Sequence, residues 1–165
     1  MLALEQPVTG HDLGGDASIN YSRPPLEIVP FEPWHLEWLQ LQASQLGLAA
    51  TLTMDHGRSL QHSGPCQSAW AGMEVVACAG IIELWHGRSQ VWSLLSGSFP
   101  CYAKSIHRAV RDFLDSYRCA RLECVVDPRA PAAIRWAEHL GFQYESTMPK
   151  YTPSGETQLM MVRLE

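Results

Sequence analysis

Three features are scarce or missing in this chain of 165 residues, and each excludes a class of protein. No stretch approaches the ~20 consecutive apolar residues that a membrane-spanning helix needs. Lys and Arg number 12 against 17 Asp and Glu, so the net charge of −5 argues against a nucleic-acid or anionic-membrane partner. The opening residues MLALEQPVTGHD contain neither a basic segment nor a long apolar run, which predicts no signal peptide.

The five cysteines are odd in number, are never spaced as C-x-x-C, and in several cases lie within apolar patterns. This usage predicts reduced, buried thiols and a cytoplasmic location. His56, His62 and Cys66 invite comparison with a metal site, but their spacing matches no zinc pattern. We therefore predict no metal ligand in this chain.

Residues 1–24 differ in composition from the rest of the chain. They are polar, rich in glycine and without a hydrophobic period, so we expect an extended arm. Such an arm becomes ordered only where contacts offset an entropy cost of ~1 kcal/mol or more per residue. A neighbouring protein, or a second copy of this chain, would supply those contacts. The chain is 46% hydrophobic, enough for a core, and residues 25–165 are predicted to form one domain.

Hydrophobic periodicity divides this domain into seven strands and four helices. The predicted strands span 26–29, 68–73, 75–85, 89–96, 121–127, 143–151 and 156–165. The predicted helices begin at Pro33, near residue 48, at Phe99 and at Pro131. The strand–helix–strand crossover from 89 to 127 lies among antiparallel hairpins. The fold class is therefore α/β (α+β): a mixed, mostly antiparallel sheet with helices on both faces.

Two predicted helices carry side chains that could serve either packing and solvation or ligand binding. Trp34 and Trp38 share a face with Leu41, and we expect them to pack in the core rather than clamp a ligand. Lys104 and two arginines follow one side of the helix that begins at Phe99. That stripe has two readings, a phosphate-binding surface or an ordinary solvated helix face.

The stretch RWAEHLGFQYES, residues 135–146, combines a helix end with a strand start. Its apolar helical pattern runs through Ala137 to Leu140, and Gly141 is predicted to end the helix in a left-handed cap. Phe142 and strand-forming residues follow at once.

This corner and the order of elements resemble the GNAT acetyltransferases. The resemblance covers residues 26–165, and AAIRWAEHLGFQYES is similar to the family's fourth helix and the strand after it. It implies that the glycine caps the helix and that the phenylalanine packs beneath it. The phrases VWSLLS and AVRDFLD also resemble a divergent branch of the family from bacteriophage genomes.

The resemblance implies a site for acetyl-CoA in a V-shaped gap, where the strands before the third and fourth helices separate. Exposed main chain of the first strand would pair with the pantetheine arm, near Leu94, Leu95 and Ser96. The N-terminus of the third helix would receive the pyrophosphate. The residues implied there are Tyr102, Ala103, Lys104 and Ser105.

Several positions depart from the family pattern. The pyrophosphate loop of the family reads Q/R-x-x-G-x-G/A, whereas residues 100–105 read PCYAKS, without either glycine. Ala137 occupies the position where many members place a proton-donating tyrosine. Glu83 is the candidate general base and Tyr144 the candidate acid, although a strand tyrosine more often serves packing.

Three functions remain open. The first is an N-acetyltransferase that moves an acetyl group from acetyl-CoA to an unidentified amine. The second is a non-catalytic structural component of a larger assembly, for example a bacteriophage virion protein docked through residues 1–24, which would place the chain within a phage particle. The third is an acyl-CoA or small-ligand binding module without turnover.

Overall fold

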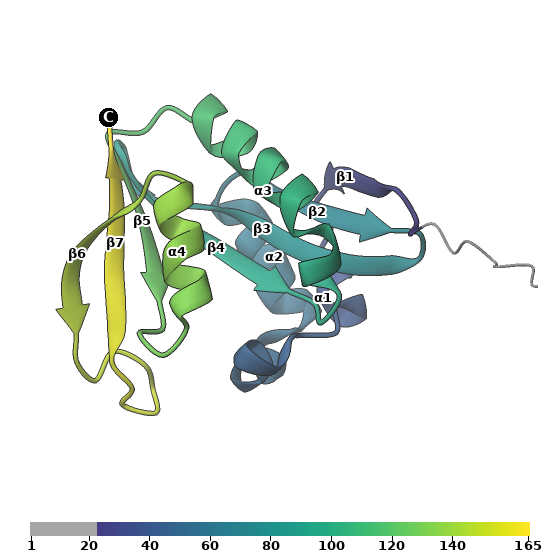
Figure 1. The fold of residues 1–165 in the computed structure, drawn as a ribbon, viewed down its shortest axis with the longest axis horizontal. Helices are drawn as coiled ribbons and strands as arrows, with labels where there is room; N and C mark the ends of the chain where they lie inside the picture. The colour runs from purple at the N-terminus through teal and green to yellow at the C-terminus, as the bar shows by residue number, and fades with distance from the viewer. Residues whose placement is uncertain (1–22) are drawn as a thin grey trace, which may run out of the picture.

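A computed structural model describes residues 23–165, which form one seven-stranded sheet with the order β1-β2-β3-β4-β5-β7-β6 (Figure 1). The strands are β1 (Leu26–Pro30), β2 (Cys66–Ala71), β3 (Glu74–Trp85), β4 (Arg88–Leu95), β5 (Arg121–Val126), β6 (Gln143–Met148) and β7 (Gln158–Leu164). The β4–β5 pair is parallel and the other pairs are antiparallel. The predicted mixed, mostly antiparallel sheet is therefore confirmed.

Helices cover both faces of this sheet (Figure 1). They are α1 (His35–Trp38), the 3-10 helix η1 (Ala43–Thr51), α2 (Met54–Ser63), α3 (Phe99–Ser116) and α4 (Pro131–His139). In the view of Figure 1, α3 and α4 lie in front of the sheet, and α2 lies behind it. No helix among residues 23–165 is both long and apolar enough to span a membrane.

The sequence missed two features of the first hundred residues. The 3-10 helix η1 was not predicted, and α1 is a single turn rather than a helix reaching Leu41. Because α1 is so short, its buried residues are His35 and Leu36, while Trp34 and Trp38 are 40% and 54% exposed. The expectation that both tryptophans belong to the core is therefore corrected: they pack on each other and on Trp70, at the surface.

The corner at Gly141 has the predicted left-handed conformation, with φ +90°. The Gly141 amide donates to the carbonyl of Glu138, and the Phe142 amide donates to that of Ala137. The Phe142 side chain is 3% exposed and packs with Leu140 in the core between α3, α4 and the sheet. The glycine therefore lets the chain reverse tightly enough for the next side chain to seal the core under α4.

The strands β4 and β5 are paired over only three residues each. Arg88, Ser89 and Gln90 face Arg121, Leu122 and Glu123, respectively, and no pairing continues beyond them. β4 nevertheless runs on to Leu95, and β5 runs on to Val126. The two strands therefore separate toward the end of β4 at which α3 begins, as the family resemblance implies.

Buried charges hold the narrow end of this gap. Glu123 is 2% exposed and accepts hydrogen bonds from the guanidinium groups of Arg88 and Arg121. Burial alone would raise the pKa of Glu123, but the hydrogen bonds from the two arginines outweigh burial and lower it. Arg121 also pairs with Glu145 on β6, so the cluster links β4, β5 and the far edge of the sheet.

Candidate functional site

The wide end of the gap is lined on one side by the edge of β4 that does not face β3. The Ser96 amide donates to the carbonyl of Val76 on β3. Because the hydrogen-bonding direction alternates along a strand, the main-chain groups of Leu94 also face β3, and those of Ser93 and Leu95 face the gap. Of the three residues predicted to hold pantetheine, only Leu95 therefore offers its amide to the gap, and Ser93 is the partner that the sequence missed.

A side-chain amide already occupies this edge. The Leu95 amide donates to Oε1 of Gln45 at 2.8 Å, and Nε2 of Gln45 donates to the carbonyl of Ser93 at 3.0 Å. One carboxamide thus takes the two groups that a residue of a parallel neighbouring strand would take. The β4 edge is therefore complementary to an amide.

The segment before Gln45 extends this contact along the chain. The Gln42 amide donates to the carbonyl of Leu95 at 2.9 Å, and the Gly97 amide donates to that of Gln40 at 3.2 Å. Leu41 and Ser96 form an isolated antiparallel bridge between them. Residues 40–45 consequently cover the β4 edge from Ser93 to Gly97.

The N-terminus of α3 offers little to an anion. The Phe99 amide donates to the carbonyl of Ser96, the Cys101 amide donates to that of Ser98, and Pro100 has no amide hydrogen. The Ser98 hydroxyl donates to a carboxylate oxygen of Glu74 at 2.6 Å. The first turn of α3 is therefore bonded internally and has a carboxylate beside it, which opposes the phosphate binding typical of helix N-termini.

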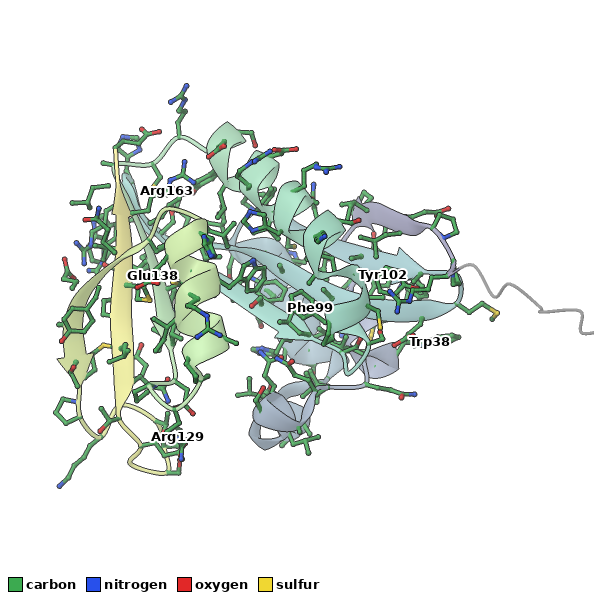
Figure 2. All side chains as sticks on the ribbon, viewed as in Figure 1. Trp38, Phe99, Tyr102, Arg129, Glu138 and Arg163 are labelled. Atoms are coloured by element: carbon green, nitrogen blue, oxygen red, sulfur yellow. The ribbon has the colours of Figure 1, made fainter. Side chains whose placement is uncertain are left out.

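A cavity of about 340 Å³ lies between α3 and α4, beside this turn. Its lining residues are Phe99, Ala103, Lys104, His107, Trp136 and His139. The indole Nε1 of Trp136 donates to Nδ1 of His107 at 3.2 Å, which assigns the proton of a neutral His107 to Nε2. Figure 2 shows Phe99 at the lower end of α3, and its ring centroid lies 5.4 Å from that of Trp136 on α4. The side chain of Lys104 and two imidazole rings thus border a hollow whose exposed surface is almost wholly apolar.

Solved structures share this architecture, although no family model and no curated protein matches the sequence. Ard1 from Thermoplasma volcanium is 16% identical with a TM-score of 0.70, and the match covers 84% of this chain and 97% of that one. A ribosomal-protein-S5-alanine acetyltransferase from Vibrio fischeri is 12% identical with a TM-score of 0.66, covering 84% and 92%. A GNAT-family acetyltransferase from Bacillus anthracis is 12% identical with a TM-score of 0.62, covering 87% and 96%. The chain has the GNAT fold.

Within this GNAT fold, the predicted phosphate residues lie in α3 itself. The helix begins at Phe99, so Tyr102, Ala103, Lys104 and Ser105 stand beyond its first three residues, where main-chain amides are used by the helix. Ala103 and Lys104 nevertheless line the cavity. A phosphate group in this cavity would therefore meet the side chain of Lys104 rather than a row of free amides.

The two predicted proton-transfer residues lie apart from the wide end of the gap. Glu83 is exposed and pairs with Ser89, at the narrow end where β4 and β5 are still joined. Tyr144 is 59% exposed on the edge strand β6, and its hydroxyl lies 2.9 Å from that of Thr147. The structure does not bring these side chains together, so their roles as base and acid remain predictions.

The described cysteines, histidines and carboxylates form no group of three or more that suits a metal ion. The functional side chains that the sequence did not reveal are Gln45 and His107. No local pattern marks Gln45, because its partners lie 48 and 50 residues away. His107 had a weak signal, since it stands one turn after Ala103 on the same helix face.

Proposed function

We propose that this chain is an acetyltransferase that binds acetyl-CoA in the gap between β4 and β5 and transfers the acetyl group to an amine. The observation that carries the proposal is the β4 edge, where the Ser93 carbonyl and the Leu95 amide already bind a carboxamide. The pantetheine arm of CoA is a chain of secondary amides, so the same two groups suit it.

The fit of the described residues to CoA is uneven. The amide-bearing arm fits the β4 edge, because the groups there already bind a carboxamide, that of Gln45, and β5 has separated from β4 at this point. The phosphates do not fit the first turn of α3, whose amides are used and whose neighbour is Glu74. Lys104, at the border of the cavity, would supply the positive charge instead, and a neutral His107 could donate one hydrogen bond from Nε2.

The thioester supplies an activated acyl group with a good leaving group. The β4 edge would fix the direction in which the thioester carbonyl points, and positioning of this kind lowers the entropic barrier to attack. The nitrogen of a neutral amine would bond to the carbonyl carbon as the carbon–sulfur bond breaks, and CoA would leave as the thiolate. The proton lost from the nitrogen would pass through water to the sulfur, which gives the amide and the thiol of CoA. No side chain of the chain is assigned as acid or base in this scheme.

A transfer assay tests this proposal. The protein is incubated with acetyl-CoA and either a small polyamine or a peptide with an N-terminal alanine, and acetylated amine is measured by mass spectrometry. The exposed thiol of Cys101 makes mass detection of the product preferable to thiol reagents. Product formation that requires the folded protein supports transfer, and its absence with every amine tested argues for the second candidate.

The second candidate is a module that binds without turnover, and two observations favour it. Ala137 occupies the family's tyrosine position and is buried, and the amides at the N-terminus of α3 are used within the chain. A role in a larger assembly, including a phage particle, stays a prediction, because the arm that would dock lies almost wholly outside the described residues. Binding of acetyl-CoA without acetylated product would favour the module.

A further inference from the structure

We propose that residues 40–51 form a strap that closes the β4 edge in the free protein, with the Gln45 carboxamide acting as an internal substitute for a ligand amide. This inference rests on the proposed function, because it concerns the regulation of the same site. It predicts that a ligand with an amide chain must displace Gln45 before it can occupy the gap.

The Gln45 carboxamide lies where a residue of β5 would lie if the pairing of β4 with β5 continued to Leu94. The pairing of β4 with β5 ends where Gln90 faces Glu123, an offset of 33 positions. The same offset would place Asp127 opposite Leu94, the residue between the two groups that Gln45 binds. Because β5 has turned away by then, the carboxamide fills the vacancy that the separation of the strands creates.

Residues 40–42 of the strap bind β4 through main-chain hydrogen bonds, whereas η1 is attached only narrowly, which suits a segment that opens. No residue of η1 is buried; Gln45 is partly buried, and the other members of η1 are exposed. Leu46 and Leu48 are 59% and 44% exposed, so apolar packing does not hold η1 to the sheet. Segments with few buried contacts open at low free energy, and here the hydrogen bonds of Gln45 are the main link between η1 and β4.

Release of the strap would leave the β4 edge intact. Leu94 and Leu95 are each 6% exposed, and β4 is fully paired with β3 along its other edge. The strand therefore keeps its position when Gln45 leaves. Ligand binding replaces one side-chain amide by one ligand amide, so the free energy that favours the closed strap is small and a ligand can overcome it.

The experiment compares Gln45→Ala with Gln40→Ala, a matched control in which an exposed side chain without a hydrogen bond is truncated on the same strap. Amide hydrogen exchange of Leu95 is measured by NMR in the free proteins, and CoA affinity is measured by calorimetry. Gln45→Ala is expected to speed exchange at Leu95 about fivefold to tenfold, as loss of one or two net hydrogen bonds would. It is also expected to tighten CoA binding about threefold or more, whereas Gln40→Ala leaves both unchanged.

Gln45→Glu keeps the size of the side chain and the acceptor for the Leu95 amide but removes the donor to Ser93, so it is expected to weaken closure less at Leu95 than Gln45→Ala does. Equal rates of amide hydrogen exchange at Leu95 in Gln45→Ala and Gln40→Ala would contradict closure of the β4 edge by Gln45, whatever the CoA result. CoA affinity that is unchanged or weaker in Gln45→Ala would overturn the displacement of Gln45 by ligand. Faster exchange without CoA binding in any variant would support closure by Gln45 and overturn the proposed acetyl-CoA function, so the two failures are distinct.

Discussion

Arg88, the first paired residue of β4, and Glu123, the last paired residue of β5, form a two-point ion pair. Nε of Arg88 lies 2.7 Å from one carboxylate oxygen of Glu123, and its NH2 group lies 3.0 Å from the other. The pair marks the point from which the two strands diverge, because pairing ends at Glu123. The gap therefore has a narrow end held by charge and a wide end at which residues 40–45, including the Gln45 carboxamide, cover the edge of β4.

Replacing Glu123 with Gln is expected to lower the free energy of unfolding by about 2 kcal/mol. Breaking a buried ion pair costs roughly 3–5 kcal/mol, and we reduce this because water reaches both arginine partners. The side chains of Arg88 and Arg121 are 32% and 29% exposed. Urea denaturation measures the change. The control is Glu165→Gln, which removes a surface ion pair with Arg118 and should lower the free energy of unfolding by less than about 0.5 kcal/mol. Equal losses of stability in the two variants would contradict a stabilising role of the Glu123 ion pairs.

The stability that Glu123 provides should depend on pH in a defined direction. Its pKa is lowered in the folded state, so its contribution is fully present above the unfolded-state pKa of about 4.3 and is lost as the pH falls through the folded-state value. The difference in unfolding free energy between wild type and Glu123→Gln should therefore be constant near pH 6 and shrink toward pH 3. Denaturation curves at several pH values measure it. A difference that grows on acidification would refute the ion-pair account.

Substituting Ala for Gly141 should lower stability by about 1–2 kcal/mol, because φ is +90° and a side chain in the left-handed region is strained. Space is not the obstacle, since the new Cβ would meet its nearest neighbour, an Arg163 side-chain atom, at 3.6 Å. Gly97→Ala is the matched control, with no positive φ and nothing within 4 Å of the new Cβ. Thermal unfolding of both variants compares them, and equal melting temperatures would count against the cap.

Lys104→Ala should weaken CoA binding about fivefold, the factor that corresponds to about 1 kcal/mol from a partly exposed charge. Binding of pantetheine, which lacks the phosphates, should stay the same. Arg111→Ala is the control, because Arg111 lies on the same helix but pairs with Asp112 and does not line the cavity. If Lys104→Ala weakens pantetheine as much as CoA, the cavity between α3 and α4 is not the phosphate site.

Much of this fold was readable from local patterns. Alternation in the strands and the run Leu140-Gly141-Phe142 depend on neighbours in sequence, and the structure confirms both the sheet and the cap. The exposure of Trp34 and Trp38 could not be predicted from the sequence, because it depends on where α1 ends. A helix of one turn cannot present a full apolar face, so the two indoles stay at the surface on Trp70.

The site was harder to predict from the sequence than the fold, because it depends on contacts between residues that are distant in the sequence. Leu95 was predicted, but which of its neighbours faces the gap depends on the register of β4 with β3, which the sequence does not display. Gln45 lies in a segment without a clear period and binds residues about fifty positions away. Tyr144 alternates correctly for a strand, yet the strand order places β6 at the outer edge of the sheet, beyond β7.

Calorimetric titration of acetyl-CoA into the wild-type protein and into Gln45→Ala tests most directly whether the gap between β4 and β5 is a CoA site. The account predicts saturable binding to wild type with a Kd of about 100 µM or tighter, equivalent to roughly 5.5 kcal/mol, and tighter binding to the variant. Absence of binding to both proteins at millimolar acetyl-CoA would contradict it.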